Sequence, residues 1–158
     1  DAVSQVVAET AYIEWRQLVL LDSAGNSAIH TGGKALGIHA SARGNQCAAA
    51  ANLLANEQVP QAMVTNFENS SGHLAQRLIS ALEAGIEAGG EAGDVRSAGV
   101  QVVHEVSWPI VDLRVDWDEN PISRLQTIWK EYQPQLDAYV TRALNPESAP
   151  SHGVPGDL

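Results

Sequence analysis

The sequence predicts an α+β fold with antiparallel sheet, and three observations support this. Two short apolar segments flank a polar turn near the start, two helical patterns follow one another in the middle, and two further strand patterns precede a final helix. A doubly wound parallel sheet would instead alternate single strands with single helices. The 158 residues suit one domain, and an apolar fraction of 44% is enough to build a core.

The first half of the chain is expected to begin with a helix and continue into strands. Residues 1–12 place their valines on one helical face, as in a helix that starts before this sequence. Residues 18–21 and 27–31 flank a turn at 22–26 and predict a β-hairpin, and residues 36–42 suit a third strand. The alanine run 47–51 stays open, because alanine favours a helix whereas small side chains also suit a close sheet contact.

Two helices are expected next. Asn56 is the predicted N-cap of the first, which ends at residues 69–72, and Ser71 is the predicted cap of the second, over residues 73–88. Gly89 and Gly90 end the second helix. The apolar stripes of the two helices are Val59, Met63, Val64 and Phe67, and Leu74, Leu78, Ile79, Leu82 and Ile86.

The last third of the chain is expected to hold two strands, at residues 99–106 and 110–117, and one helix. Asn120 is the predicted cap of that helix, Pro121 suits its first position, and Pro134 should kink it or end it at Gln133. Residues 145–158 contain three prolines and two glycines and are expected to be extended. The predicted organisation is therefore one domain over residues 1–144 with a tail at 145–158.

Composition excludes several classes of protein. Nine Lys and Arg residues against nineteen Asp and Glu residues give a net charge of −10, whereas a nucleic-acid backbone or an anionic membrane needs a basic face. The single cysteine, Cys47, excludes an internal disulfide framework and a four-thiolate zinc site. No apolar run approaches the length that spans a bilayer, so we expect a cytoplasmic protein without nucleic-acid or membrane partners.

The strand at 110–117 is the most informative local feature. Side chains alternate across a strand, so Asp112, Arg114 and Asp116 share one face. Such a row is either a solvated outer face, as charge rows on strands usually are, or a charge network that lines a pocket. In the second case Arg114 would clamp a substrate carboxylate while both aspartates fix the fork of its guanidinium. His30 is a further candidate substrate-binding residue.

The remaining motifs point to no cofactor. The five histidines, 30, 39, 73, 104 and 152, form no pair with metal-ligand spacing, so no metal site is expected. Cys47 has no adjacent basic group and is interpreted as a small buried side chain. No phosphate-binding loop or dinucleotide fingerprint is present. Asn52 and Asn56 are either helix caps or amide donors to an oxyanion.

Several segments, taken in order, resemble the bacterial family called domain of unknown function 1028, which is placed in the N-terminal-nucleophile (Ntn) hydrolase superfamily. The resemblance runs nearly end to end of the chain, and the ordered set carries it, since no single motif is diagnostic. Five segments make up the set: residues 15–18 together with 22–25, residues 52–56, residues 82–85 together with 89–93, residues 111–116, and residues 149–157.

The resemblance implies a four-layer αββα sandwich with antiparallel sheets, of which this chain is similar to the C-terminal two thirds. An Ntn hydrolase attacks an amide carbonyl with a Thr, Ser or Cys at the start of a chain, whose α-amine, with a pKa of about 8, acts as base. Asp1 cannot take that role, so the resemblance implies a nucleophile on a missing or separate N-terminal polypeptide. Asn52 matches the family's Asn before Leu-Leu and is the expected oxyanion or amide contact.

Two functions follow as expectations. The first is hydrolysis of a small amide or C–N bond, with this chain supplying the pocket wall and the oxyanion donor. The alternative is a non-catalytic small-molecule-binding or assembly protein on the same fold. Unpaired strand edges in an incomplete sheet favour association, so a homo-oligomer is also expected.

Overall fold

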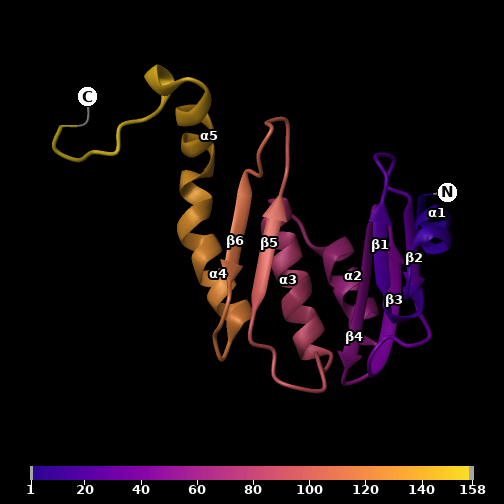
Figure 1. The fold of residues 1–158 in the computed structure, drawn as a ribbon. Coiled ribbons are helices and arrows are strands. Elements are labelled where there is room, and N and C mark those ends of the chain that lie inside the picture. The colour runs from indigo at the N-terminus through magenta and orange to yellow at the C-terminus, as the bar shows by residue number, and fades with distance from the viewer. Residues whose placement is uncertain (1, 157–158) are drawn as a thin grey trace. The chain divides into compact units, whose positions relative to one another are not determined.

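The computed structural model describes residues 2–156, which fall into two compact units, residues 1–96 and 97–158 (Figure 1). Both mix helices with strands, and the described residues form three two-stranded antiparallel sheets. The α+β class and the antiparallel pairing are therefore confirmed. A single domain over residues 1–144 stays a prediction.

The first unit begins with helix α1 (Ala2–Glu9) and a 3-10 turn (Ile13–Trp15). Strands β1 (Gln17–Leu21) and β2 (Ser27–Thr31) follow, then β3 (Ile38–Gly44) and β4 (Cys47–Leu54), and helices α2 (Val59–Asn69) and α3 (Leu74–Glu87). In the first hairpin, Gln17 lies opposite Thr31 and Leu21 lies opposite Ser27. The hairpin predicted around residues 22–26 is confirmed.

The layers of this unit follow from which elements touch. Helix α1 contacts β2, β1 contacts β4, α2 contacts both β3 and β4, and α3 packs on α2 (Figure 1). The tips of the two hairpins meet, because Gly25, with a φ of 85°, lies against Gln46. Helix, hairpin, hairpin and helix pair are thus stacked in that order.

The alanine run forms strand β4, which settles the question that the sequence left open. Ala42 and Gly44 of β3 lie on the face that α2 covers, and a Cβ on Gly44 would meet Val64 of that helix. Ala48 and Ala50 lie on the opposite face by strand alternation. Small side chains on both faces let the neighbouring layers approach, and this packing overrides the helical preference of alanine.

Both predicted helix caps in this unit are wrong by two residues. Gln58, and not Asn56, is the N-cap of α2, and the Asn56 side chain instead accepts from the Gln58 N–H at 2.9 Å and donates to the Ala88 carbonyl at 2.8 Å. His73, and not Ser71, caps α3, where its Nδ1 accepts from the Ala75 N–H at 3.1 Å.

A pH-dependent contribution to stability is expected from the β1–β2 turn. The Asp22 carboxylate accepts from the Asn26 side chain and from the N–H groups of Asn26 and Ala24, and these bonds lower its pKa below 3.8. Because the pKa of Asp22 is lower in the folded protein than in the unfolded chain, its carboxylate stabilises the fold at pH values above the unfolded-state pKa. This stabilisation is lost as the pH falls through the folded-state pKa. We expect Asp22→Asn to flatten the acid limb of the unfolding free energy below about pH 4 in urea titrations at stepped pH. An unchanged slope would contradict this.

Gly32 packs the end of β2 onto the 3-10 turn. A Cβ at Gly32 would overlap the main-chain carbonyl of Glu14, whereas a Cβ at Gly33 would meet only the Glu14 Oε2 atom, at 3.3 Å. Gly32→Ala is therefore expected to lower the free energy of unfolding by about 1–3 kcal/mol, and the adjacent Gly33→Ala to leave it nearly unchanged. Urea unfolding of the two variants checks this, and equal losses would contradict it.

The second unit holds strands β5 (Ala98–Val102) and β6 (Val111–Val115), helix α4 (Pro121–Tyr132), a 3-10 turn (Gln133–Gln135), helix α5 (Leu136–Leu144) and a last 3-10 turn (Pro146–Ser148). Both strands are shorter than predicted. Asn120 and Pro121 start α4 as expected, and the turn that contains Pro134 interrupts the helix where the sequence indicated. Trp129 and Leu125 of α4 are fully buried, and α4 contacts both strands.

Candidate functional site

The charged row lies on the exposed face of β6. Asp112 and Arg114 are exposed, whereas Val111 and Val115, which alternate with them, are buried. Asp116 follows the strand and is also exposed. Asp112 and Arg114 share a face of β6, Asp116 lies beyond the strand, and a role of the row in substrate binding stays a prediction.

The neighbouring strand leaves this face open. Arg114 lies opposite Gly99 of β5, and Asp112 lies opposite the exposed Gln101. Within residues 2–156, neither aspartate of the row forms an ion pair with Arg114. Neither aspartate therefore fixes the guanidinium in this structure.

Asn52 lies at an irregularity in β4. The register with β3 shifts between Ile38, which pairs with Leu54, and Ala40, which pairs with Ala51, so β4 carries one extra residue there. Leu53 has a φ of 54°, in the left-handed region that branched side chains rarely occupy. Such bulges redirect side chains and cluster near active sites.

Backbone hydrogen bonds hold this bulge on two sides. The Leu53 N–H donates to the Leu36 carbonyl at 3.0 Å, and the Leu53 carbonyl accepts from the Ala92 N–H at 2.8 Å. Asn52, half-buried, continues the face of Ala48 and Ala50, which is turned away from α2. The bulge therefore fixes the backbone that carries the Asn52 amide.

Gln17, which was not predicted as a site residue, joins the two hairpins beside Asn52. Its Nε2 lies 3.1 Å from Thr31 Oγ1, 3.3 Å from the Ala51 carbonyl oxygen and 3.5 Å from the Ala40 carbonyl oxygen. The sequence signal that could have identified Gln17 is its position as the polar first residue of an otherwise apolar strand.

His30 lies on the other face of the first hairpin. The side chains of Gln17 and Thr31 are bonded across the strands, so His30, one residue before Thr31, is turned the opposite way. Its Nε2 is 3.4 Å from the Ile13 carbonyl oxygen in the 3-10 turn. The structure therefore does not bring His30 together with the surface that carries Asn52.

Cys47 is half-buried between the end of the β3–β4 hairpin and α2. Burial raises the pKa of its thiol, and the Glu68 carboxylate raises it further, whereas the Arg77 guanidinium opposes the rise. Glu68 Oε1 accepts from the Asn45 N–H at 2.6 Å. The arrangement opposes thiolate formation, which a nucleophilic cysteine needs.

Alkylation of Cys47 is expected to depend on Glu68. Glu68→Gln keeps an oxygen that can accept from Asn45 but removes the charge, so the pKa of the thiol should fall and the alkylation profile should shift to lower pH. Iodoacetamide rates measured between pH 7 and 10 check this, with the exposed Glu57→Gln as the control. An identical shift in both variants would contradict it.

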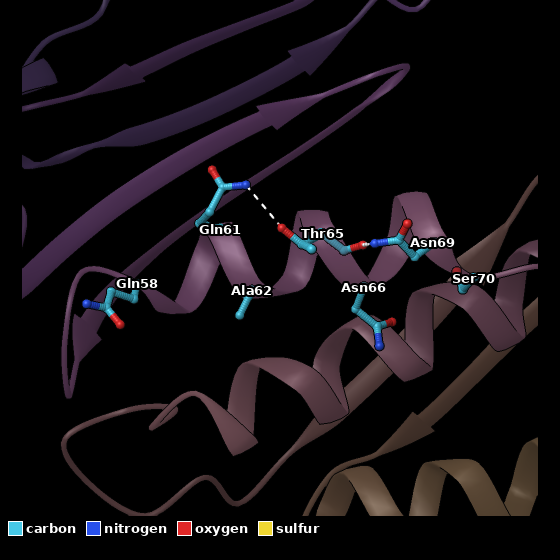
Figure 2. A pocket seen from close by; sticks show the side chains of 7 residues that line it. All are labelled: Gln58, Gln61, Ala62, Thr65, Asn66, Asn69 and Ser70. Atoms are coloured by element: carbon cyan, nitrogen blue, oxygen red, sulfur yellow. Dashed lines mark hydrogen bonds between the residues drawn. The ribbon is translucent and has the colours of Figure 1, made fainter.

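A separate groove of about 690 Å³ runs along α2 (Figure 2). Its lining is uncharged and rich in amides, namely Gln58, Gln61, Ala62, Thr65, Asn66, Asn69 and Ser70. Gln61 donates to Thr65 Oγ1 at 3.2 Å and Asn69 donates to the Thr65 carbonyl at 2.9 Å, whereas Asn66 Oδ1 is buried without a hydrogen-bond partner. None of the residues selected from the sequence lines this groove.

The His, Cys, Asp and Glu side chains of residues 2–156 form no group that could hold a metal ion. Among the helices of the same residues, none combines the length and apolar character needed to cross a membrane.

Comparison with known proteins places this layered α+β chain in a family. Residues 1–125 match DUF1028, a family of unknown function, and the chain belongs to it. A crystal structure of protein SPO2555 from Silicibacter pomeroyi, described with the same family, is similar at 32% identity and a TM-score of 0.77. The match covers 84% of this chain and 57% of that one, so this chain spans little more than half the length of its relative. No curated protein matches.

Proposed function

We propose that this chain is part of an Ntn-type hydrolase of a small amide, whose Thr, Ser or Cys nucleophile lies on an N-terminal segment outside this sequence. The bulge at Asn52 and Leu53 carries the proposal. It holds a half-buried amide side chain beside the junction of the two hairpins, on a strained backbone that hydrogen bonds fix from both sides. Preorganised amide donors of this kind stabilise the oxyanion of acyl transfer.

The layer order of the first unit supports the proposal. Helix α1, the β1–β2 hairpin, the β3–β4 hairpin and the α2–α3 pair follow one another, as the four layers of an αββα sandwich do. The resemblance of the ordered segments to the Ntn superfamily points to the same architecture.

The proposed chemistry divides between two polypeptide segments. The side chain of the N-terminal residue attacks the amide carbonyl, its α-amine accepts the proton, and the same proton later passes to the leaving nitrogen. Water then cleaves the acyl-enzyme and regenerates the nucleophile. Asn52 donates a hydrogen bond to the oxyanion in both steps.

Intact mass and N-terminal sequencing of the purified natural protein test this proposal. We expect a polypeptide that begins with Thr, Ser or Cys, and a screen of small amides should then find a substrate whose hydrolysis stops when that residue is replaced by alanine. A folded protein without such a terminus would overturn the proposal and leave the non-catalytic binding function. Saturable ligand binding that depends on Arg114 would characterise that alternative.

A further inference from the structure

The open face of the β5–β6 hairpin carries charges of both signs at a regular spacing. Asp112 and Arg114 are exposed, two residues apart on one strand, and within residues 2–156 they do not pair with each other. Side chains two residues apart on a strand are about 6.6 Å apart at their Cα atoms. One negative and one positive group are thus presented side by side to a ligand.

The strand beside them provides a flat, polar floor. Gly99, opposite Arg114, has no side chain to cover the guanidinium, and the amide of Gln101, opposite Asp112, is exposed on the same face. Gln101 can donate to and accept from a peptide group that lies across the two strands. Asp116 has no neighbouring residue of this kind in β5, because β5 pairs only with residues 111–115 of β6.

We propose that this face binds a zwitterion of dipeptide size, with its ammonium group at Asp112 and its carboxylate at Arg114. An extended dipeptide separates its terminal charges by about two residues of chain, which is also the separation of Asp112 and Arg114 along β6. A carboxylate gains the bidentate geometry that a guanidinium offers. A net charge of −10 repels anions over long distances, whereas a zwitterion carries no net charge.

Binding of a zwitterion at this face goes beyond the proposed hydrolysis and does not depend on it. Binding itself needs no nucleophile.

Calorimetric titration with three matched ligands tests the inference. Glycylglycine carries both charges, glycylglycinamide lacks the carboxylate, and N-acetylglycylglycine lacks the ammonium group. We expect glycylglycine to bind up to about fivefold more tightly than either blocked ligand, since an exposed ion pair contributes up to about that factor. Equal affinity for the three ligands, or no saturable binding of glycylglycine, would overturn the inference.

Variants assign each charge to its partner. Arg114→Gln should weaken glycylglycine binding and leave glycylglycinamide unaffected, and Asp112→Asn should weaken glycylglycine binding and leave N-acetylglycylglycine unaffected. The exposed Arg124→Gln and Asp137→Asn are the controls, and unchanged melting temperatures confirm that all variants fold. If Asp116→Asn weakened glycylglycine binding and Asp112→Asn did not, the assignment of the ammonium site to Asp112 would be overturned.

The same measurements separate this inference from the proposed hydrolase. Selective binding of glycylglycine by a protein without a Thr, Ser or Cys terminus leaves the inference standing and overturns the hydrolase. Amide hydrolysis by a protein that does not bind glycylglycine selectively leaves the hydrolase standing and overturns the inference.

Discussion

Replacing Trp129 with alanine is expected to lower the free energy of unfolding of the second unit by about 3–5 kcal/mol. The Trp129 side chain is fully buried in α4, as are Leu125 of the same helix and Val111 of β6, which the helix contacts. Alanine would leave a cavity the size of an indole ring in a unit of only 62 residues, 97–158. Urea unfolding followed by far-UV circular dichroism measures the loss.

Trp117→Ala is the matched control for that experiment. Trp117 is the same residue type and is 78% exposed, just after β6. Its replacement should change the unfolding free energy by only about 0.5 kcal/mol, the usual range for surface positions. Similar losses in the two variants would show that Trp129 is not the centre of this core.

Replacing Asn52 with alanine is expected to lower kcat about 10²–10³-fold if the chain contributes an oxyanion donor to amide hydrolysis. The Asn52 amide sits on the bulge of β4, and its loss removes a hydrogen bond that strengthens as the carbonyl oxygen becomes negative. Because the interaction is formed mainly in the transition state, KM should change much less than kcat. Steady-state kinetics on the amide substrate measure both.

Two further variants make this test specific. Asn45→Ala alters the same residue type in the exposed turn between β3 and β4 and should leave kcat unchanged. Asn52→Asp keeps the shape but replaces the donor with an acceptor, so it should lose as much activity as alanine while the melting temperature stays close to that of the natural protein. Retained activity in Asn52→Asp would remove Asn52 from the catalytic machinery.

Alternation and turn chemistry made parts of this fold predictable from the sequence. The Asp22 turn specified the first hairpin, and the alternation of Val111, Asp112 and Leu113 specified which face of β6 is charged. Both patterns depend on neighbours in the chain. Pro134 likewise interrupts the C-terminal helix by local sterics alone.

Features that depend on distant partners were not predictable. The cap at Gln58 was missed because the Asn56 side chain bonds to the end of α3, which is far away in the sequence. The cap at His73 is a local bond, but an imidazole is not among the side chains that usually cap helices. The alanine strand required knowledge of the layers on either side of it. The bulge at Leu53 arises from contacts with residues 36 and 92, and no local signal marks it.

The candidate site was predicted only in part. The exposed charged face was recognised, and Asn52 was selected by resemblance, whereas Gln17 and the groove along α2 were missed. His30 was selected, and the structure turns it away from the Asn52 surface. The companion polypeptide, the homo-oligomer and the cytoplasmic location stay predictions.

The alanines of β4 limit how this protein can vary over evolution. Ala48 and Ala50 lie on the face turned away from α2, and β1 contacts that strand, so their methyl groups help to set the distance between the two hairpins. A larger residue at either position would push the hairpins apart and stretch the hydrogen bonds of Gln17. In relatives, a larger side chain at position 48 or 50 of β4 should therefore occur together with a smaller side chain on the facing part of β1. A position in β4 and its facing position in β1 should thus vary as a pair.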